Sequence, residues 1–157
     1  MNKINSEAIL LANKLCSTMM KKFRAEELPP NGHWHYHQGV FLFGMYKIYQ
    51  VTGEEKYFDY IKAYVDNNVD ERGRINYKCE FDDAMTGILL YPIYERTGDE
   101  KYRYTLDECA AWIPKFFKTP SGGFWHKFQC IDQMWLDGFY MAQPLCVRYA
   151  STFGTHK

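Results

Sequence analysis

The chain has 157 residues, a length that fits one domain, and we expect residues 1–157 to fold around a single core. Apolar residues make up 46% and charged residues 24% of the chain, which excludes a disordered or fibrous protein. Nineteen Lys and Arg balance nineteen Asp and Glu, so the positive charge that draws proteins to nucleic acid or anionic lipid is missing, and neither is an expected partner.

The first segment predicts an amphipathic helix over residues 5–23. Lys and Asn occupy one face, and the other carries apolar residues three to four positions apart, at Ile4, Ala8, Leu11, Leu15 and Met19. Asn13 and Lys14 interrupt the apolar run and no small-residue cleavage site follows, so the segment does not resemble a signal peptide. No apolar run approaches the roughly 18 residues that span a bilayer. We therefore expect a soluble protein.

Two further helices form a predicted hairpin. The sequence Leu28-Pro-Pro-Asn-Gly32 ends the first helix. Residues 37–51 are almost entirely apolar and aromatic, and we expect this helix to be buried on most sides and to end at Gly53, where glycine can adopt a left-handed conformation. Residues 54–68 alternate apolar residues with charges, which indicates a half-exposed helix packed on the previous one.

The same unit returns 45 residues later. Segment 48–61 (IYQVTGEEKYFDYI) matches segment 93–106 (IYERTGDEKYRYTL) at most of its aromatic, glycine and charged positions, which indicates stacked helical hairpins. The third unit reaches Gly154 without an outer helix, so the sequence resembles part of a longer array. The further helices that this repeat predicts are a buried one from about Asp82 to Thr97, an outer one from about Asp99 to Phe117, and a third buried one from Asp137 to about Thr152.

The repeat aligns three polar residues at the starts of the inner helices. His37, Asp82 and Asp137 each lie twelve residues before the tyrosine of their own repeat. If the inner helices run parallel around a common axis, these side chains meet at one rim, beside the loops 71–81 and 118–136. Aspartate at a helix start is also a common N-cap, so a purely structural role stays open.

Cysteines and histidines do not predict a metal site. His33, His35 and His37 would share one face of a strand, but at a helix start this spacing splays them apart, so we expect no metal there. The cysteines are odd in number and form no CxxC pair, which is typical of reduced thiols in the cytoplasm. They are Cys16, Cys79, Cys109, Cys130 and Cys146.

Six stretches carry a resemblance to a known family. They are Trp34-His-Tyr-His-Gln-Gly39, Val69-Asp-Glu-Arg-Gly-Arg-Ile75, Phe81-Asp-Asp-Ala84, Tyr94-Glu-Arg-Thr-Gly-Asp-Glu-Lys-Tyr102, Gly122-Gly-Phe-Trp-His-Lys127 and Gln133-Met-Trp-Leu-Asp-Gly-Phe-Tyr-Met141. Together they resemble the unsaturated rhamnogalacturonyl hydrolases, which belong with the unsaturated glucuronyl hydrolases in glycoside hydrolase families 105 and 88. The resemblance covers the chain from about residue 10 to its end, and the last stretch is highly specific.

This resemblance implies an all-α fold and a reaction. Family members fold as an (α/α)6 barrel of inner and outer helices, of which this chain supplies about the first half. Their substrate is an unsaturated uronic acid at the non-reducing end of a pectin fragment such as a rhamnogalacturonan oligosaccharide. Water adds across its C4–C5 double bond, and the resulting hemiketal opens and releases the next sugar. The resemblance implies no metal and no cofactor.

The resemblance also implies roles for particular residues. Asp137 corresponds to the carboxyl that gives a proton to C4 and then accepts one from the attacking water. Asp82 corresponds to a second active-site aspartate that binds sugar hydroxyls and helps to hold Asp137 and the water. Asp83 adjoins it, but only one of the two can face the rim. The expected substrate-binding residues are Trp34, Tyr36, His37, His126, Trp135 and Met141.

Two other functions stay open at this point. Stacked hairpins of this length also build solenoids that bind protein partners on a concave face, and such a binder would not need the rim aspartates. Alternatively, the chain is an inactive fragment that binds saccharide. In either case, the missing half of the barrel would leave the apolar inner helices exposed to water. This favours a homo-oligomer in which another copy covers the helix of Cys146 and Tyr149.

Overall fold

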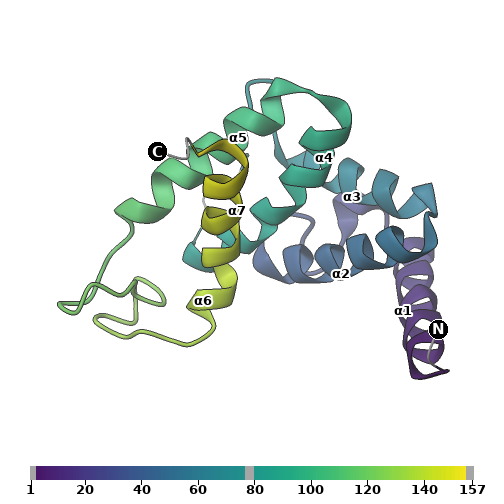
Figure 1. Cartoon of the computed structure of the whole chain (residues 1–157), viewed down its shortest axis with the longest axis horizontal. Helices are drawn as coiled ribbons and strands as arrows, with labels where there is room; N and C mark the ends of the chain where they lie inside the picture. Colours follow the sequence, from purple (N-terminus) through teal and green to yellow (C-terminus); the bar gives the residue numbers. More distant parts are fainter. Residues whose placement is uncertain (1–2, 77–79, 155–157) are drawn as a thin grey trace.

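The protein is all-α, as the sequence predicts. The computed structural model describes residues 3–76 and 80–154, and within these two ranges it contains helices and loops but no β-strand (Figure 1). Helix α1 lies at one end of the molecule, and the loop that follows α5 forms the other end. None of the described helices combines the length and the apolar character that crossing a membrane requires.

Helix α1 (Lys3–Lys22) forms where periodicity predicts it, but it packs through a different face. Leu11 and Leu15, which the predicted apolar stripe contains, are 69% and 55% exposed. Cys16 is buried instead, and Met19 packs against the core. The face that meets the core therefore keeps Met19 of the predicted stripe but is centred on Cys16 in place of Leu11 and Leu15.

The break after α1 depends on glycine. A single 3₁₀ turn (Ala25–Glu27) leads into the predicted stop, where the N–H of Gly32 donates to the carbonyl of Leu28 at 2.8 Å. Gly32 has φ of 71°, and a Cβ atom there would lie 1.9 Å from the carbonyl oxygen of Glu26. Only glycine fits such a position, so the chain reverses here and delivers the next helix to the core.

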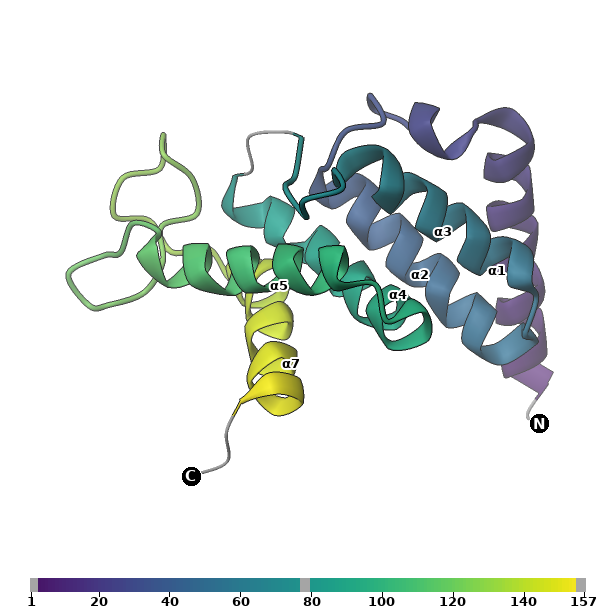
Figure 2. The same cartoon turned by 90° about the horizontal axis from the view of Figure 1, so that it is seen from above.

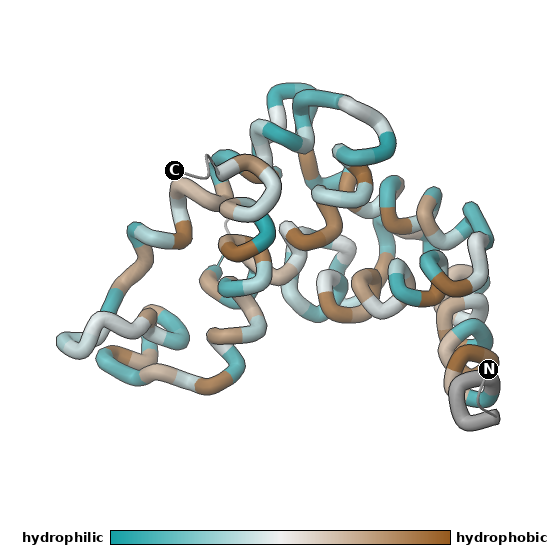
Figure 3. The backbone as a smooth tube through the Cα atoms, viewed as in Figure 1, coloured by the Kyte–Doolittle hydropathy of each residue, from teal (hydrophilic) through white to brown (hydrophobic). Residues whose placement is uncertain are grey.

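Helices α2 (Tyr36–Thr52) and α3 (Glu55–Asn68) form the predicted antiparallel hairpin and lie alongside one another in Figure 2. Gly53 closes α2 in the left-handed conformation, with φ of 69°. The prediction that α2 is buried on most sides is wrong, since only the face toward α1, α3 and the next unit is covered. Figure 3 shows the resulting alternation of hydrophobic and hydrophilic segments along this helix.

The second unit repeats this hairpin. A buried 3₁₀ segment η2 (Phe81–Leu89) continues into α4 (Leu90–Thr97), and the outer helix α5 (Glu100–Trp112) continues into the short turn η3 (Ile113–Lys115). Every residue from 81 to 93 is buried, which confirms most of the predicted buried helix, but its last three residues, 95–97, are exposed. Pro92 lies in α4, lacks an N–H group and crowds the preceding turn, which is consistent with the tighter 3₁₀ winding before it.

The repeated tyrosines tie each hairpin together. Tyr49 donates to Glu55 at 3.4 Å, and Tyr94 donates to Glu100 at 3.3 Å, so the same bond recurs six residues apart in both units. Arg96 then joins the units, because its guanidinium donates to the Tyr49 hydroxyl at 3.1 Å and to the Glu55 carboxylate at 2.6 Å. The sequence repeat therefore reflects a repeated contact between consecutive helices.

The third inner helix is less regular and less buried than predicted. It consists of α6 (Gly138–Met141) and α7 (Gln143–Phe153), separated at Ala142, shortly before Pro144. Gly154 has φ of −67°, so it does not repeat the left-handed ending of the two earlier inner helices.

The contacts of α7 account for this exposure. Along α7 only Leu145 is buried, because this helix packs on η2 and α5 from one side. Cys146 and Tyr149, expected on an uncovered flank, are partly buried, and Tyr149 donates to Asp107 of α5 at 2.6 Å.

Substitutions at two glycines of α2 can test how closely the first two units pack. Gly39 faces Thr86 of η2, and a Cβ atom at Gly39 would lie 2.8 Å from the Thr86 Cα atom. We expect Gly39→Ala to lower the free energy of unfolding by about 1–3 kcal/mol because the two backbones would have to separate. Gly44→Ala is the control, because apart from its chain neighbours and the nearby backbone of its own helix no atom of the described residues lies within 4 Å of the added Cβ. That variant should gain roughly 0.5–1 kcal/mol. Urea denaturation measures both, and equal effects would contradict the packing described here.

Candidate active site

A folded loop between η3 and α6 carries one side of the site. The loop bends at Gly122, which has φ of 88°, and the N–H of Thr119 donates to the Gly123 carbonyl at 2.7 Å. Further along, the N–H of His126 donates to the Gln133 carbonyl at 2.8 Å, which joins the two arms of the loop. An aromatic cluster packs the base of the loop and consists of Phe116, Phe117, Trp125 and Phe128.

Three side chains from separate segments converge beside this loop. Asp82 comes from the start of η2, His126 from the loop, and Asp137 from the start of α6. The His126 Nδ1 atom lies 3.9 Å from Asp82 Oδ1 and 3.7 Å from Asp137 Oδ2. The sequence repeat predicted that His37, Asp82 and Asp137 share a rim. The structure brings Asp82 and Asp137 together around the His126 imidazole, whereas His37 is exposed and is not part of this cluster.

The polar atoms of this cluster are buried without hydrogen bonds. Asp82 Oδ1, His126 Nδ1 and Asp137 Oδ1 have no hydrogen-bond partner among the described residues. The side chains of Asp82 and His126 are only 4% and 5% exposed, whereas Asp137 is 39% exposed. A buried polar group that lacks a partner is costly to the fold, so such a concentration of them is typical of a site that binds a ligand.

Helix capping does not account for either aspartate. At the start of η2 the caps are Glu80 and Asp83, whose side chains each accept from the other residue's backbone N–H. Asp83 also accepts from the Tyr36 N–H at 3.1 Å, so it joins η2 to α2. Asp137 precedes α6, but its side chain makes no capping bond there. The capping alternative is therefore wrong for Asp82 and Asp137, and the capping bonds at the start of η2 are made by Glu80 and Asp83.

Burial sets the electrostatics of Asp82. Loss of contact with water raises the pKa of its carboxyl, and this increase is opposed by His126 when its imidazole is protonated and by the positive charge of Lys127. The Lys127 Nζ atom lies 3.6 Å from Asp82 Oδ2. Sequence reasoning assigned no role to Lys127, and the only signal that could have found it is its position directly after His126 in the glycine-bent motif.

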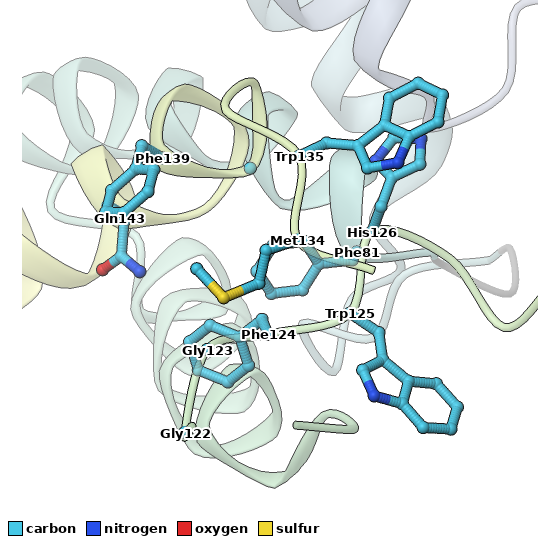
Figure 4. Close-up of a pocket in the computed structure, with 11 residues that line it drawn as sticks. Phe81, Gly122, Gly123, Phe124, Trp125, His126, Met134, Trp135, Phe139 and Gln143 are labelled. Atoms are coloured by element: carbon cyan, nitrogen blue, oxygen red, sulfur yellow. The ribbon is translucent and has the colours of Figure 1, made fainter. Parts of the chain in front are cut away.

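Trp135 supports the imidazole and opens onto a hollow. Its ring stacks on His126 with centroids 4.0 Å apart and planes 4° from parallel (Figure 4). About half of the Trp135 residue remains exposed. Both residues line a hollow of about 240 Å³, whose other walls include Phe81, Phe124, Met134 and Phe139. An exposed indole face beside a hollow of aromatic side chains suits the flat face of a sugar ring.

A second and more polar hollow adjoins Asp82 from another direction. It has a volume of about 440 Å³, and its walls include Tyr36, Glu80, Asp82, Lys127 and Gln129. The tyrosine ring of Tyr36 stacks against its two histidine neighbours, which orients it along this wall. Asp82 and His126 therefore lie between two hollows, one largely aromatic and one largely polar.

Three of the predicted substrate-binding residues lie outside this arrangement. Trp34 is 1% exposed and donates through Nε1 to the Asp83 carbonyl at 3.2 Å, so it belongs to the core and is not a sugar platform. His37 is exposed and lines neither hollow. Met141 is partly buried and packs against the core. The sugar-binding role predicted for these three residues has no geometric support.

The histidine row differs from its prediction. His35 and His37 are not splayed apart, because their rings stack with centroids 4.6 Å apart and their Nδ1 atoms are 2.8 Å from each other. His35 is the N-cap of α2, and its Nδ1 also accepts from the His37 N–H at 3.3 Å, which keeps the two rings together. The pair therefore has a structural role at the start of α2.

Comparison with known proteins assigns the chain to the glycoside hydrolases. The family model described as Glycosyl Hydrolase Family 88 matches residues 11–157, so the chain belongs to that family. A solved glycoside hydrolase from family 105 of C. acetobutylicum ATCC 824 is 34% identical in sequence, with a TM-score of 0.74. The match covers 88% of this chain and 40% of the solved chain.

These matches place the helical hairpins in a known architecture. The hairpins are part of an (α/α)6 barrel, as the sequence resemblance implies. The chain spans less than half the length of the solved relative. The described site therefore consists of residues from two consecutive inner helices of the barrel and from the loop between them.

Proposed function

We propose that this chain carries the acid and water-binding groups of an unsaturated uronyl hydrolase. Its substrate would be an oligosaccharide derived from pectin, such as a rhamnogalacturonan fragment, with an unsaturated uronic acid at the non-reducing end. The observation that carries this proposal is the convergence of Asp82 and Asp137 on the His126 imidazole, beside an aromatic hollow. Membership of glycosyl hydrolase family 88 supports the reaction class.

Asp137 is the proton carrier in this proposal. It is the most exposed member of the cluster, so its carboxyl can reach a bound sugar. The acid gives its proton to C4, and the positive charge that develops at C5 is shared with the ring oxygen. Water then adds to C5 while the Asp137 carboxylate accepts a proton from it, so the enzyme ends in its starting state. The product is a hemiketal, whose opening releases the next sugar.

Asp82 and His126 hold the reactants. The unpaired Oδ1 atom of Asp82 can accept a hydrogen bond from a sugar hydroxyl or from the attacking water. The unpaired Nδ1 atom of His126 faces both carboxyls and can complete the same network. Trp135 keeps the imidazole in place from one side. These groups are preorganised, which limits the entropy lost when substrate and water are positioned.

The cellular setting is part of the same proposal. Cys16, Cys130 and Cys146 carry free thiols, which supports a reducing compartment such as the cytoplasm. There the protein would act on short oligosaccharides that a lyase has already cleaved and left with the C4–C5 double bond.

Purified protein tests the proposal directly. We expect the chain to consume an unsaturated uronyl disaccharide, measured as loss of the ultraviolet absorbance of the conjugated double bond. The saturated disaccharide of the same sugars is the control and should not react, because it has no double bond to hydrate. Absence of turnover with a folded, concentrated sample would contradict the proposal for this chain.

A further inference from the structure

We propose that Asp82, His126 and Asp137 also form a binding site for a zinc ion. One ligand atom from each residue lies within 4.8 Å of the other two. Zinc holds nitrogen and oxygen ligands at about 2.0–2.2 Å in a tetrahedron, which separates neighbouring ligand atoms by about 3.4 Å. The His126 Nδ1 atom lies 3.9 Å from Asp82 Oδ1 and 3.7 Å from Asp137 Oδ2, so small side-chain rotations would complete the geometry.

The unpaired atoms are an independent sign of a ligand. Asp82 Oδ1 and His126 Nδ1 belong to side chains that are 4% and 5% exposed, and both point into the cluster without a hydrogen bond from the described residues. A bound cation would satisfy both atoms at once, since a carboxylate oxygen and a neutral imidazole nitrogen each offer a lone pair.

The donor set favours zinc over the common hard cations. Magnesium and calcium prefer oxygen ligands, whereas an imidazole nitrogen together with two carboxylates suits zinc. Three protein ligands leave the fourth tetrahedral position open, and the 39% exposure of the Asp137 side chain shows that solvent reaches the cluster. Lys127 should weaken zinc binding, because its ammonium lies 3.6 Å from Asp82 Oδ2 and repels a second positive charge.

Calorimetric titration of the whole chain with zinc chloride tests this inference. We expect one ion per chain at this site, and a loss of affinity of at least about tenfold in Asp82→Asn and in His126→Gln, because each removes a ligand. Lys127→Met should instead raise the affinity severalfold, because it removes the opposing charge. Circular dichroism checks that each variant is folded, and the His126 ring resonances should shift on zinc addition in nuclear magnetic resonance spectra.

Two control variants address other zinc ligands on the surface. The double variant His35→Gln and His37→Gln removes the stacked histidine pair, and Cys130→Ser removes a partly exposed thiol. Both should bind zinc with the affinity of the parent chain. Unchanged affinity in the Asp82 and His126 variants would overturn the inference, as would loss of binding only in a control variant.

Zinc would also block the proposed reaction. Coordination would occupy the atoms that are proposed to hold water and sugar, so zinc should inhibit hydration in competition with substrate. This consequence rests on the proposed function, whereas the calorimetric result does not. A chain that binds zinc as described but hydrates no substrate would support the site and contradict the function.

Discussion

Replacing Asp137 with asparagine should abolish hydration of the unsaturated uronyl disaccharide. An amide cannot give a proton to C4, and it cannot accept one from the water that attacks C5. We expect a loss of at least about 10³-fold in kcat, toward the detection limit, because proton transfer in both directions depends on this one group. The decrease in ultraviolet absorbance over time measures it.

The structure indicates that this variant will fold. The Asp137 side chain makes no capping bond to α6, so asparagine removes no helix-stabilising contact. The matched control is Asp132→Asn in the same loop. Asp132 has φ of 57°, a conformation that asparagine tolerates, and the amide oxygen can still accept from Trp125 Nε1. The control should keep its turnover, and unchanged turnover in Asp137→Asn would refute the assigned role.

The hairpins were predictable because the same local chemistry occurs twice. Gly53 and Gly98 both end an inner helix in the left-handed conformation, with φ of 69° and 65°. In each unit the tyrosine before the glycine bonds to a glutamate after it. Such contacts lie within a few residues along the chain, so they leave a pattern that the sequence alone reveals.

The errors concern contacts between distant segments. The apolar stripe of α1 was placed on Leu11 and Leu15, whereas the buried position is Cys16. Periodicity defines the apolar side of a helix, but which residue meets the core depends on how closely the neighbouring helix approaches. Likewise, α7 was expected to be buried, but it packs from one side only, and Leu145 is its one buried residue.

The site could be predicted only in part. The repeat offset identified Asp82 and Asp137 as neighbours, because equivalent positions of stacked units lie at the same end, but it wrongly added His37 to them. The sugar-binding role predicted for Trp34 was wrong, because an indole at a helix start suits a sugar site and a core equally well. Only the structure shows that its Nε1 donates to the Asp83 carbonyl in the core. Lys127 was missed because a single loop lysine has no pattern to mark it.

The adjacent aspartates Asp82 and Asp83 give the second large effect, in two different measurements. We expect Asp82→Asn to lower turnover by at least about 10²-fold, because the buried carboxylate no longer positions sugar and water. The fold should remain as stable as that of the parent chain, within about 1 kcal/mol. Asp83→Asn should instead keep its turnover and lower the stability of the fold. It removes one of the two acceptors that hold the backbone N–H groups of Tyr36 and Glu80, which should cost about 1–3 kcal/mol of stability.

The sign of the Asp82 effect on stability follows from its burial. Loss of water raises the pKa of this carboxyl above its value in the unfolded chain, so the folded state binds its proton more tightly. The charged form therefore lowers stability at neutral pH. This cost begins to shrink as the pH falls through the folded pKa and is gone below the unfolded pKa. Asparagine resembles the protonated form, so Asp82→Asn should be at least as stable as the parent near pH 7 and should show a weaker gain in stability on mild acidification.

Urea denaturation at several pH values, combined with turnover per folded molecule, separates the roles of Asp82 and Asp83. A variant Asp82→Asn that unfolds easily but keeps its turnover would show that Asp82 supports the fold and that the site must lie elsewhere.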